Sequence, residues 1–135
     1  MPKAKDIMTK NVIGVKEETP IYEAVSLIAK NNVTGVPVVG DDMTLVGILS
    51  EKDVIRLFYL SRKDGDNKTV SDFMTQPVVS FDENEDLMDV CDCLMNNHFR
   101  RVPVVSKGRL VGVISRRDII YEYILHLERE SASTG

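Results

Sequence analysis

Two short segments of this chain combine a glycine, a serine and an aspartate in the same order. Gly47–Asp53 reads Gly-Ile-Leu-Ser-Glu-Lys-Asp, and Gly112–Asp118 reads Gly-Val-Ile-Ser-Arg-Arg-Asp. In each segment an apolar strand runs into a serine that is suited to cap a following helix. Unpaired backbone N–H groups at such a helix start attract an anion, and the serine hydroxyl adds a donor. The pattern therefore indicates an anion-binding helix start at Ser50 and again at Ser115.

The aspartate of each segment adds a second binding function. Asp53 and Asp118 lie one helical turn after the serine, where a carboxylate can accept two hydrogen bonds from a vicinal diol such as ribose. Dinucleotide-binding folds place an acid beside a phosphate-binding helix start in the same way. A single such segment would be explained better by a serine and an acid that only stabilise the helix. Its occurrence twice, in register, favours a nucleotide site at each helix start.

Both segments belong to a longer internal repeat. Asp6–Asp42 aligns with Asp72–Gly108, and Leu45–Ile55 aligns with Leu110–Ile120. A repeat of this length is a supersecondary unit that cannot bury its own apolar face, so its copies must pack together. Two copies imply pseudo-twofold symmetry and two related clefts.

Each repeat is predicted to fold as strand, helix, strand, strand and helix, which makes the fold class α/β. We expect two pseudo-symmetric β-α-β-β-α repeats that pack through their sheets. The helices follow Pro20, Ser50 and Ser115, and apolar residues then recur at helical spacing. The predicted strands, two of them joined by a hairpin turn at residues 40–42, are Val12–Val15, Val36–Val39, Leu45–Leu49 and Val78–Phe81. The expected organisation is repeat 1 at 1–60, a polar linker at 61–70, repeat 2 at 71–130 and a flexible tail at 131–135.

Length and composition indicate an ordinary globular protein. The chain has 135 residues, of which 43% are hydrophobic and 28% are charged, and this is not the signature of a disordered chain. No apolar run approaches roughly 18 residues, and the first residues lack the apolar core of a secretion signal. We therefore expect a cytoplasmic protein without a membrane span.

The two cysteines are predicted to fill the core. Cys91 and Cys93 are two residues apart in a helical stretch, so their side chains diverge and should not form a disulfide. Neither His98 nor His126 completes a recognisable metal-ligand spacing with them. We expect no metal site.

The two repeats differ in charge. Asp82–Asp92 contains six acidic residues and no base, whereas Cys93–Arg117 contains six basic residues and no acid. The acidic residues open a helix, where the helix dipole favours them. The arginines flank the most strongly repeated elements, and arginine recognises phosphate through a fork of charge-assisted hydrogen bonds.

At this point the chain resembles a tandem pair of CBS domains, the Bateman module. The resemblance covers Asp6–Ile120 and rests on Asp-h-Met-Thr at the start of each repeat, h-Pro-Val-Val, and Gly-h-h-Ser-x-x-Asp, where h is hydrophobic. It implies a disc-like module with two clefts between the repeats. In that family such clefts bind adenosine compounds, namely AMP, ADP, ATP and sometimes S-adenosylmethionine, without a catalytic cofactor.

By that resemblance, each cleft takes residues from both repeats. One cleft would contain Ser50, Asp53, Thr75, Val78, Arg100, Arg101 and Arg117. The other would contain Ser115, Asp118, Thr9, Val12, Thr34 and Lys52. The aspartates would hold ribose hydroxyls, the residues after each Met-Thr would contact adenine, and the arginines would contact phosphate. The cleft of Asp53 is therefore expected to prefer phosphorylated ligands.

The sequence thus predicts a ligand-sensing regulatory module without catalytic activity, because no catalytic constellation, Walker-type loop or metal cluster is visible in it. Ligand binding would change the packing of repeats or modules and so signal to a protein partner that the sequence does not identify. One alternative is a structural dimerisation module with empty clefts. Another is nucleic-acid binding through the Arg100–Arg117 patch, against which the net charge of −4 and the lack of interleaved aromatics count. Hydrolysis of a bound nucleotide is the least supported alternative.

The last helix of each repeat is apolar on almost every side, and we therefore expect a homodimer. A helix of this kind is covered on more than one face, and a second subunit can supply the second cover. The residues concerned are Val54, Ile55, Leu57, Phe58, Tyr59 and Leu60, and Ile119, Ile120, Tyr121, Tyr123, Ile124 and Leu125.

Overall fold

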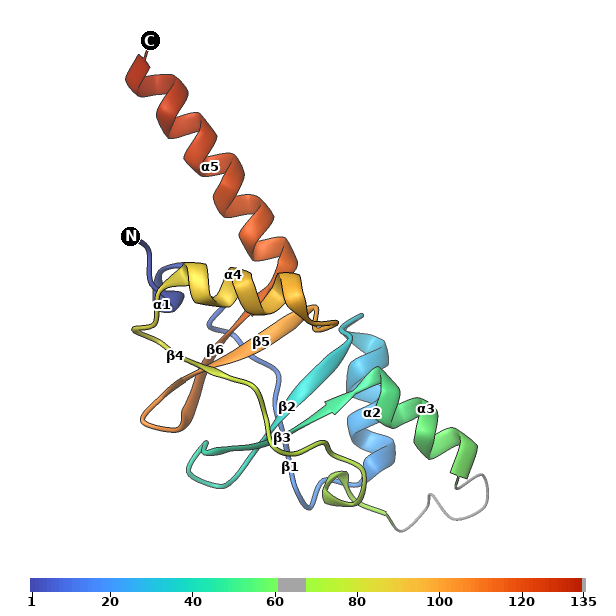
Figure 1. The fold of residues 1–135 in the computed structure, drawn as a ribbon. Coiled ribbons are helices and arrows are strands. Elements are labelled where there is room, and N and C mark those ends of the chain that lie inside the picture. Colours follow the sequence, from blue (N-terminus) through green and yellow to red (C-terminus); the bar gives the residue numbers. More distant parts are fainter. Residues whose placement is uncertain (61–67, 135) are drawn as a thin grey trace. The chain divides into compact units, whose positions relative to one another are not determined.

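A computed structural model provides the structure of residues 1–60 and 68–134, which form a mixed α/β protein with two three-stranded sheets (Figure 1). The predicted fold class is confirmed. The elements follow in the order α1 (Ala4–Ile7), β1 (Val15–Lys16), α2 (Ile21–Lys30), β2 (Gly35–Val39), β3 (Leu45–Ser50), α3 (Glu51–Leu60), β4 (Phe81–Asp82), α4 (Leu87–Asn96), β5 (Arg101–Ser106), β6 (Arg109–Ser115) and α5 (Arg116–Thr134). None of the helices in these ranges has the length and hydrophobicity needed to span a bilayer.

The chain divides into two compact units, and neither unit coincides with one sequence repeat. Unit 1 contains Met1–Val12, Val79–Lys107 and the chain from Val111 onward, and unit 2 contains Ile13–Val78 with Gly108–Leu110. Each unit therefore includes the opening segment of the other repeat. The sheet of unit 2 has the order β1-β2-β3, and that of unit 1 has the order β4-β5-β6.

This exchange of opening segments shortens the first strand of each repeat, so the predicted strand bounds at Val12–Val15 and Val78–Phe81 are wrong. Strand β1 pairs with β2 only through Val15 and Lys16, and β4 pairs with β5 only through Phe81 and Asp82. The chain leaves one unit and enters the other just before these strands. Because the preceding residues make that passage, they cannot continue the ladder.

The hairpin predicted in the first repeat is confirmed. Strands β2 and β3 pair antiparallel, from Gly35 opposite Ser50 to Val39 opposite Leu45. In the turn, the backbone N–H of Thr44 donates to Asp42 Oδ1 at 3.1 Å. Such local hydrogen bonds are typical of aspartate in turns, and those from the side chain and the backbone N–H of Thr44 lower the pKa of the Asp42 carboxyl.

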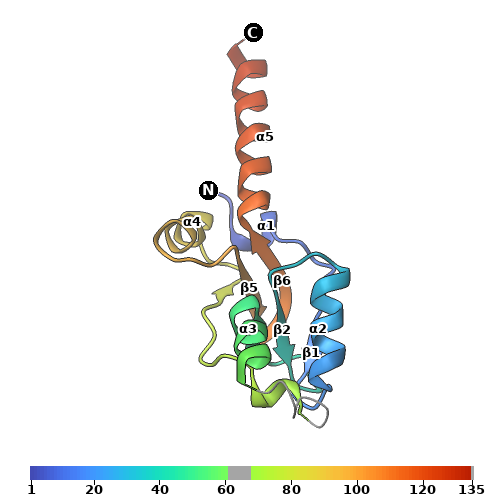
Figure 2. The same cartoon turned by 90° about the vertical axis from the view of Figure 1, so that its right-hand side faces the viewer.

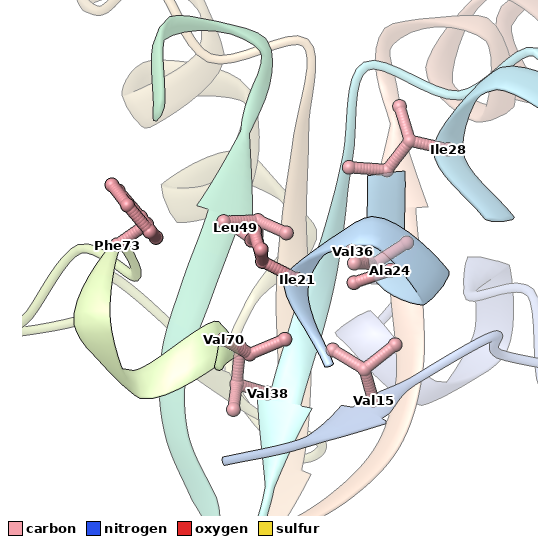
Figure 3. Close-up of a cluster of buried hydrophobic side chains, with 9 residues drawn as sticks. All are labelled: Val15, Ile21, Ala24, Ile28, Val36, Val38, Leu49, Val70 and Phe73. Atoms are coloured by element: carbon pink, nitrogen blue, oxygen red, sulfur yellow. The ribbon is translucent and has the colours of Figure 1, made fainter. Parts of the chain in front are cut away.

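A buried apolar cluster holds unit 2 together, and the exchanged segment is part of it. Figure 3 shows Ile21, Ala24 and Ile28 of α2 facing side chains from β2 and β3. Val70 and Phe73, from the opening of the second repeat, lie in the same cluster, with exposed fractions of 0% and 9%. Burying an apolar side chain of this size contributes roughly 1.5–3 kcal/mol. The exchanged segment is thus anchored in the core.

The corresponding cluster of unit 1 is anchored in the same way by the start of the chain. Ala4 of α1 is fully buried against Leu87, Val90 and Leu94 of α4. Its backbone N–H donates to the carbonyl oxygen of Glu85 at 2.9 Å. The first residues of the chain therefore belong to the core of the second repeat.

Two segments fall where the sequence predicts a linker and a tail. Of the predicted linker at 61–70, residues 61–67 lie outside the described residues, and a 3₁₀ turn begins at Val70. Helix α5 continues through Thr134, past the start of the expected flexible tail, because no proline or glycine interrupts it. Figures 1 and 2 both show α5 running on from β6 and away from the sheet of its own unit.

The methionine of the Met-Thr motif in each repeat packs against the first glycine of the Gly-h-h-Ser motif in the other repeat. A Cβ atom added to Gly47 would lie 2.7 Å from Met74 Sδ, and one added to Gly112 would lie 2.5 Å from Met8 Sδ. Both distances are below van der Waals contact, so the glycines admit the methionines. Met74 also packs against the buried cluster of unit 2, and Met8 against that of unit 1.

We predict that Gly112→Ala lowers the free energy of unfolding by about 1–3 kcal/mol, because the new methyl group overpacks the contact with Met8. Urea unfolding followed by circular dichroism measures the change. Gly40→Ala is the matched control, since its Cβ would meet no atom closer than 3.5 Å. Equal unfolding midpoints for the two variants would contradict the assigned contact.

Candidate functional site

The first candidate site, which we call the first corner, consists of Ser50, Asp53 and Thr75. Ser50 donates to Asp53 Oδ2 from its backbone N–H at 2.8 Å and from its hydroxyl at 3.0 Å. Thr75 donates its hydroxyl to Asp53 Oδ1 at 2.9 Å. The predicted cap is present as well, since the N–H of Asp53 donates back to Ser50 Oγ at 3.4 Å. Asp53 is 3% exposed and is the one buried charged residue among the described residues.

The second corner consists of Ser115, Asp118 and Thr9, and it repeats this arrangement. Ser115 donates to Asp118 Oδ2 from its backbone N–H at 2.8 Å and from its hydroxyl at 3.0 Å. Thr9 donates to Asp118 Oδ1 over a longer distance, 3.4 Å. The two serine–aspartate pairs therefore share one geometry, while the threonine contact is tighter in the first corner.

Backbone pairing places each threonine beside its aspartate. Thr75 exchanges two hydrogen bonds with Ile48, at 2.7 and 3.1 Å, and Thr9 exchanges two with Val113, at 2.8 and 3.0 Å. Ile48 and Val113 each lie two residues before the serine of their corner. The Met-Thr segment of one repeat thus extends the sheet of the other. The expected grouping of Thr75 with Asp53, and of Thr9 with Asp118, is present.

The corners differ in one residue that the sequence analysis did not select. Arg56 Nη2 donates to Asp53 Oδ1 at 3.1 Å and to the carbonyl oxygen of Phe73 at the same distance. The repeat partner of Arg56 is Tyr121, which cannot make this ion pair. The i, i+3 spacing of Asp53 and Arg56 on one helix is a signal for such a pair.

The remaining predicted site residues are divided between the units. Val78, Thr34 and Lys52 belong to unit 2, which holds the first corner. Thr34 contributes its backbone carbonyl, which accepts the N–H of Glu51 at 3.0 Å. The residues in unit 1, which holds the second corner, are Val12, Arg100, Arg101 and Arg117.

The arginines of unit 1 divide into structural and available ones. Arg116 donates to the carbonyl oxygens of Phe99 and Asn97, at 3.1 and 3.3 Å, and so fixes the segment before β5. No carboxylate among the described residues pairs with Arg100, Arg101 or Arg117.

Two of these available arginines have further features. The buried Nε of Arg101 has no hydrogen-bond partner within the same described part of the chain. Arg117 lies over the ring of Tyr121, at 5.8 Å from its centroid. Cations without counter-ions are suited to an anionic ligand.

The cysteines are partly buried free thiols in unit 1. Cys91 and Cys93 both pack against its apolar cluster, which agrees with the predicted role. Burial, assisted by the nearby charge of Asp86, raises the pKa of the Cys91 thiol. Burial also raises the pKa of the Cys93 thiol, against an opposing hydrogen bond from Asn97. Both thiols are therefore protonated at neutral pH and poorly nucleophilic.

A separate cavity of about 660 Å³ lies in unit 1 between α1 and α5. Its lining residues are Pro2, Asp6, Ile7, Glu122, His126, Arg129 and Glu130. Arg129 contacts Glu122 at 2.8 Å, and His126 Nε2 lies 3.2 Å from Glu130. This cavity includes none of the predicted site residues.

Comparison with known proteins identifies the family. The CBS domain family matches residues 4–60 and 70–124, so the chain belongs to this family as a tandem CBS pair. Protein MJ1225 of Methanocaldococcus jannaschii is 41% identical over 116 residues, which are 86% of this chain. The chain spans only 41% of the length of that relative.

Two solved structures of CBS pairs are similar and contain adenosine compounds. CBSX2 of Arabidopsis thaliana, in complex with AMP, superposes with a TM-score of 0.83 at 30% identity, covering 93% of this chain and 98% of that one. The CBS pair of protein MJ0100, in complex with 5′-methylthioadenosine and S-adenosylmethionine, gives a TM-score of 0.77 at 27% identity, covering 91% and 96%.

We predict that Asp53→Ala destabilises the protein more than Asp118→Ala does. Removing the buried Asp53 carboxylate leaves the donors of Ser50, Thr75 and Arg56 without an acceptor, at a cost of about 2–3 kcal/mol. Asp118 is half-buried and acts mainly as the partner of a helix cap, so its loss should cost about 1 kcal/mol. Urea midpoints measure the order, and a larger loss for Asp118→Ala would contradict the difference described between the corners.

Proposed function

We propose that this protein is a regulatory module that binds adenine nucleotides at its two corners and signals through a change in conformation or assembly. The aspartates Asp53 and Asp118 accept the ribose hydroxyls, while Ser50 and Ser115 present the helix starts. Thr75 and Thr9 orient the carboxylates, and the residues that follow, toward Val78 and Val12, contact the adenine. Arg100, Arg101 and Arg117 bind phosphate, with Thr34 and Lys52 as the weaker polar groups.

The single observation that carries this proposal is the duplicated corner. In each corner, a threonine from one repeat lies beside a serine and an aspartate from the other repeat. The two serine–aspartate hydrogen bonds measure 2.8 and 3.0 Å in both corners. A capping function alone would require no threonine from the other repeat. A carboxylate oriented from two sides is suited to hold a diol in one defined direction.

Two further observations support an adenine nucleotide as the ligand. The arginines Arg100, Arg101 and Arg117 have no counter-ion among the described residues, so a phosphate would supply one. The similar CBS pairs of CBSX2 and MJ0100 are complexes with AMP and with adenosyl compounds. S-adenosylmethionine is therefore the second ligand to test.

The proposed role is regulation of a protein partner without turnover of the nucleotide. The aspartates are held by capping and orienting hydrogen bonds, and no base accompanies a nucleophile at either corner within the described residues. The partner is a protein that the sequence does not identify. The cytoplasmic location predicted from the sequence stays a prediction.

We also propose a homodimer formed through α3 and α5. Both helices expose large apolar side chains, among them Phe58 at 75% and Tyr59 at 77% on α3, and Ile120 at 59% and Tyr123 at 60% on α5. Apolar surface gathered on two helices marks an interaction site more often than isolated exposed residues do. Twofold pairing of identical chains is the commonest way to cover such surface.

We predict that AMP raises the melting temperature of the protein and that its binding is detected by calorimetry. Arg101→Ala should lower the affinity for AMP more than the affinity for adenosine. One charge-assisted hydrogen bond contributes roughly 1.5–3 kcal/mol, so the loss for AMP should be about ten- to a hundredfold. Arg129→Ala is the control, because Arg129 is held by Glu122 on α5. ATP incubated with the protein should release no phosphate above background.

Several results would contradict the proposal. Absence of heat and of stabilisation with AMP, ADP, ATP and S-adenosylmethionine at millimolar concentration would favour the structural module with empty clefts. Stabilisation by RNA or DNA instead would favour the basic patch as a nucleic-acid site. An equal loss for adenosine and AMP in Arg101→Ala would make Arg101 a structural residue.

We predict that sedimentation equilibrium at micromolar concentration gives twice the chain mass of 15.2 kDa. Phe58→Glu combined with Ile124→Glu should shift the protein to monomer, because the charges would be buried in the interface. Tyr22→Glu is the matched control, since Tyr22 is an equally exposed aromatic residue, at 79%, on a different helix. A wild-type mass near that of one chain would rule out the dimer.

A further inference from the structure

The carboxylate of Asp53 is already saturated with hydrogen bonds. Four donors reach it: the N–H and hydroxyl of Ser50, the hydroxyl of Thr75 and the guanidinium of Arg56. A carboxylate offers about four lone-pair sites. No acceptor position on Asp53 is therefore left for a ribose hydroxyl until a protein donor leaves.

Arg56 is the donor that can leave most easily. The Ser50 bonds belong to the helix cap, and Thr75 is held by its backbone pairing with Ile48. The Arg56 side chain, in contrast, is 54% exposed, so water can hydrate a displaced guanidinium. A ribose hydroxyl then supplies the hydrogen bond that the buried Asp53 carboxylate loses.

The second corner lacks this obstacle. Tyr121 occupies the position of Arg56 in the second repeat, and its ring lies beneath Arg117. Within the described part of the chain, Asp118 accepts three donors: the N–H and hydroxyl of Ser115 on Oδ2, and Thr9 on Oδ1 at 3.4 Å. One of its about four acceptor positions is therefore open to a ribose hydroxyl without any rearrangement.

We propose that Arg56 is a specificity-determining residue that closes the first corner to nucleosides, so that the second corner fills first. This rests on the proposed function and adds an order of occupancy to it. A ligand enters the first corner only by displacing the guanidinium from Asp53. The arginines assigned to the Asp53 cleft led us to expect tighter binding of phosphorylated ligands there. Competition from Arg56 for the Asp53 carboxylate weakens ligand binding in that cleft.

Adenosine is the probe of choice because it carries the diol and no phosphate. Calorimetric titration of the Asp118→Ala protein reports on the first corner alone. In that background, Arg56→Tyr, which installs the residue of the second repeat, should tighten adenosine binding about tenfold, which corresponds to about 1.4 kcal/mol. Arg56→Gln should give a similar gain, because glutamine keeps much of the side-chain length without the charge. Arg129→Gln replaces an arginine that makes no hydrogen bond to either aspartate among the described residues, and it should change nothing.

Two further titrations separate this proposal from the proposed function. In the otherwise wild-type chain, Asp118→Ala should remove the tighter adenosine site and Asp53→Ala should leave it in place. Unchanged or weaker adenosine affinity in both folded Arg56 variants would overturn the role of Arg56, even if AMP and adenosine bind the wild-type protein. A wild-type protein that binds neither compound would overturn the proposed function together with this inference.

Discussion

Thr9 and Val113 exchange two backbone hydrogen bonds, as do Thr75 and Ile48, and the rest of the structure depends on these two pairs. Each pair attaches the opening segment of one repeat to the last strand of the other. A methionine precedes each threonine and fits over the strand glycine, where a Cβ would collide with its sulfur. Since Ala4, Val70 and Phe73 of these segments are then buried, the exchange is stabilised by core packing as well as by backbone hydrogen bonds.

The same pairing creates the candidate sites. The strand that accepts the Met-Thr segment ends two residues later at a serine, and the helix that follows supplies the aspartate one turn in. Backbone hydrogen bonds have defined geometry, so the threonine hydroxyl reaches the carboxylate without a loop that must be ordered. A rigid sheet and a helix start thus fix all three side chains of a corner.

Duplication gave the two corners a common geometry, and single residues now distinguish them. The serine–aspartate distances agree, whereas Arg56 stands opposite Tyr121 in the aligned repeats. Another such position is Gly35, the repeat partner of Arg101. A Cβ on Gly35 would lie 2.9 Å from the carbonyl oxygen of Leu49, so the first repeat is too closely packed there for a larger residue. Close packing in the first repeat therefore excludes an arginine at the position that corresponds to Arg101.

The parts that the sequence predicts well are those set by local chemistry. Helical spacing, the serine caps and the hairpin turn depend on neighbouring residues, and the repeat doubles each signal. The passage of the chain between units cannot be predicted from local chemistry. The two repeats align in the same way whether a Met-Thr segment packs on the sheet of its own repeat or on the sheet of the other repeat. The shortened strands at Val15 and Phe81 follow from that passage. The spacing of Asp53 and Arg56 could predict their ion pair. It could not predict the second acceptor of Arg56, the carbonyl oxygen of Phe73, because that residue belongs to the exchanged segment.

The location of the corners also bears on how a ligand could be sensed. Asp53 lies in the first turn of α3 and Asp118 in the first turn of α5, and the later turns of both helices expose apolar side chains. Any ligand that takes over hydrogen bonds from a corner acts directly on the start of such a helix. A second subunit that covers the apolar turns and a ligand that binds the corner can favour the same arrangement of the helix. In that case the ligand raises the affinity of dimerisation and the dimer raises the affinity for the ligand by the same factor.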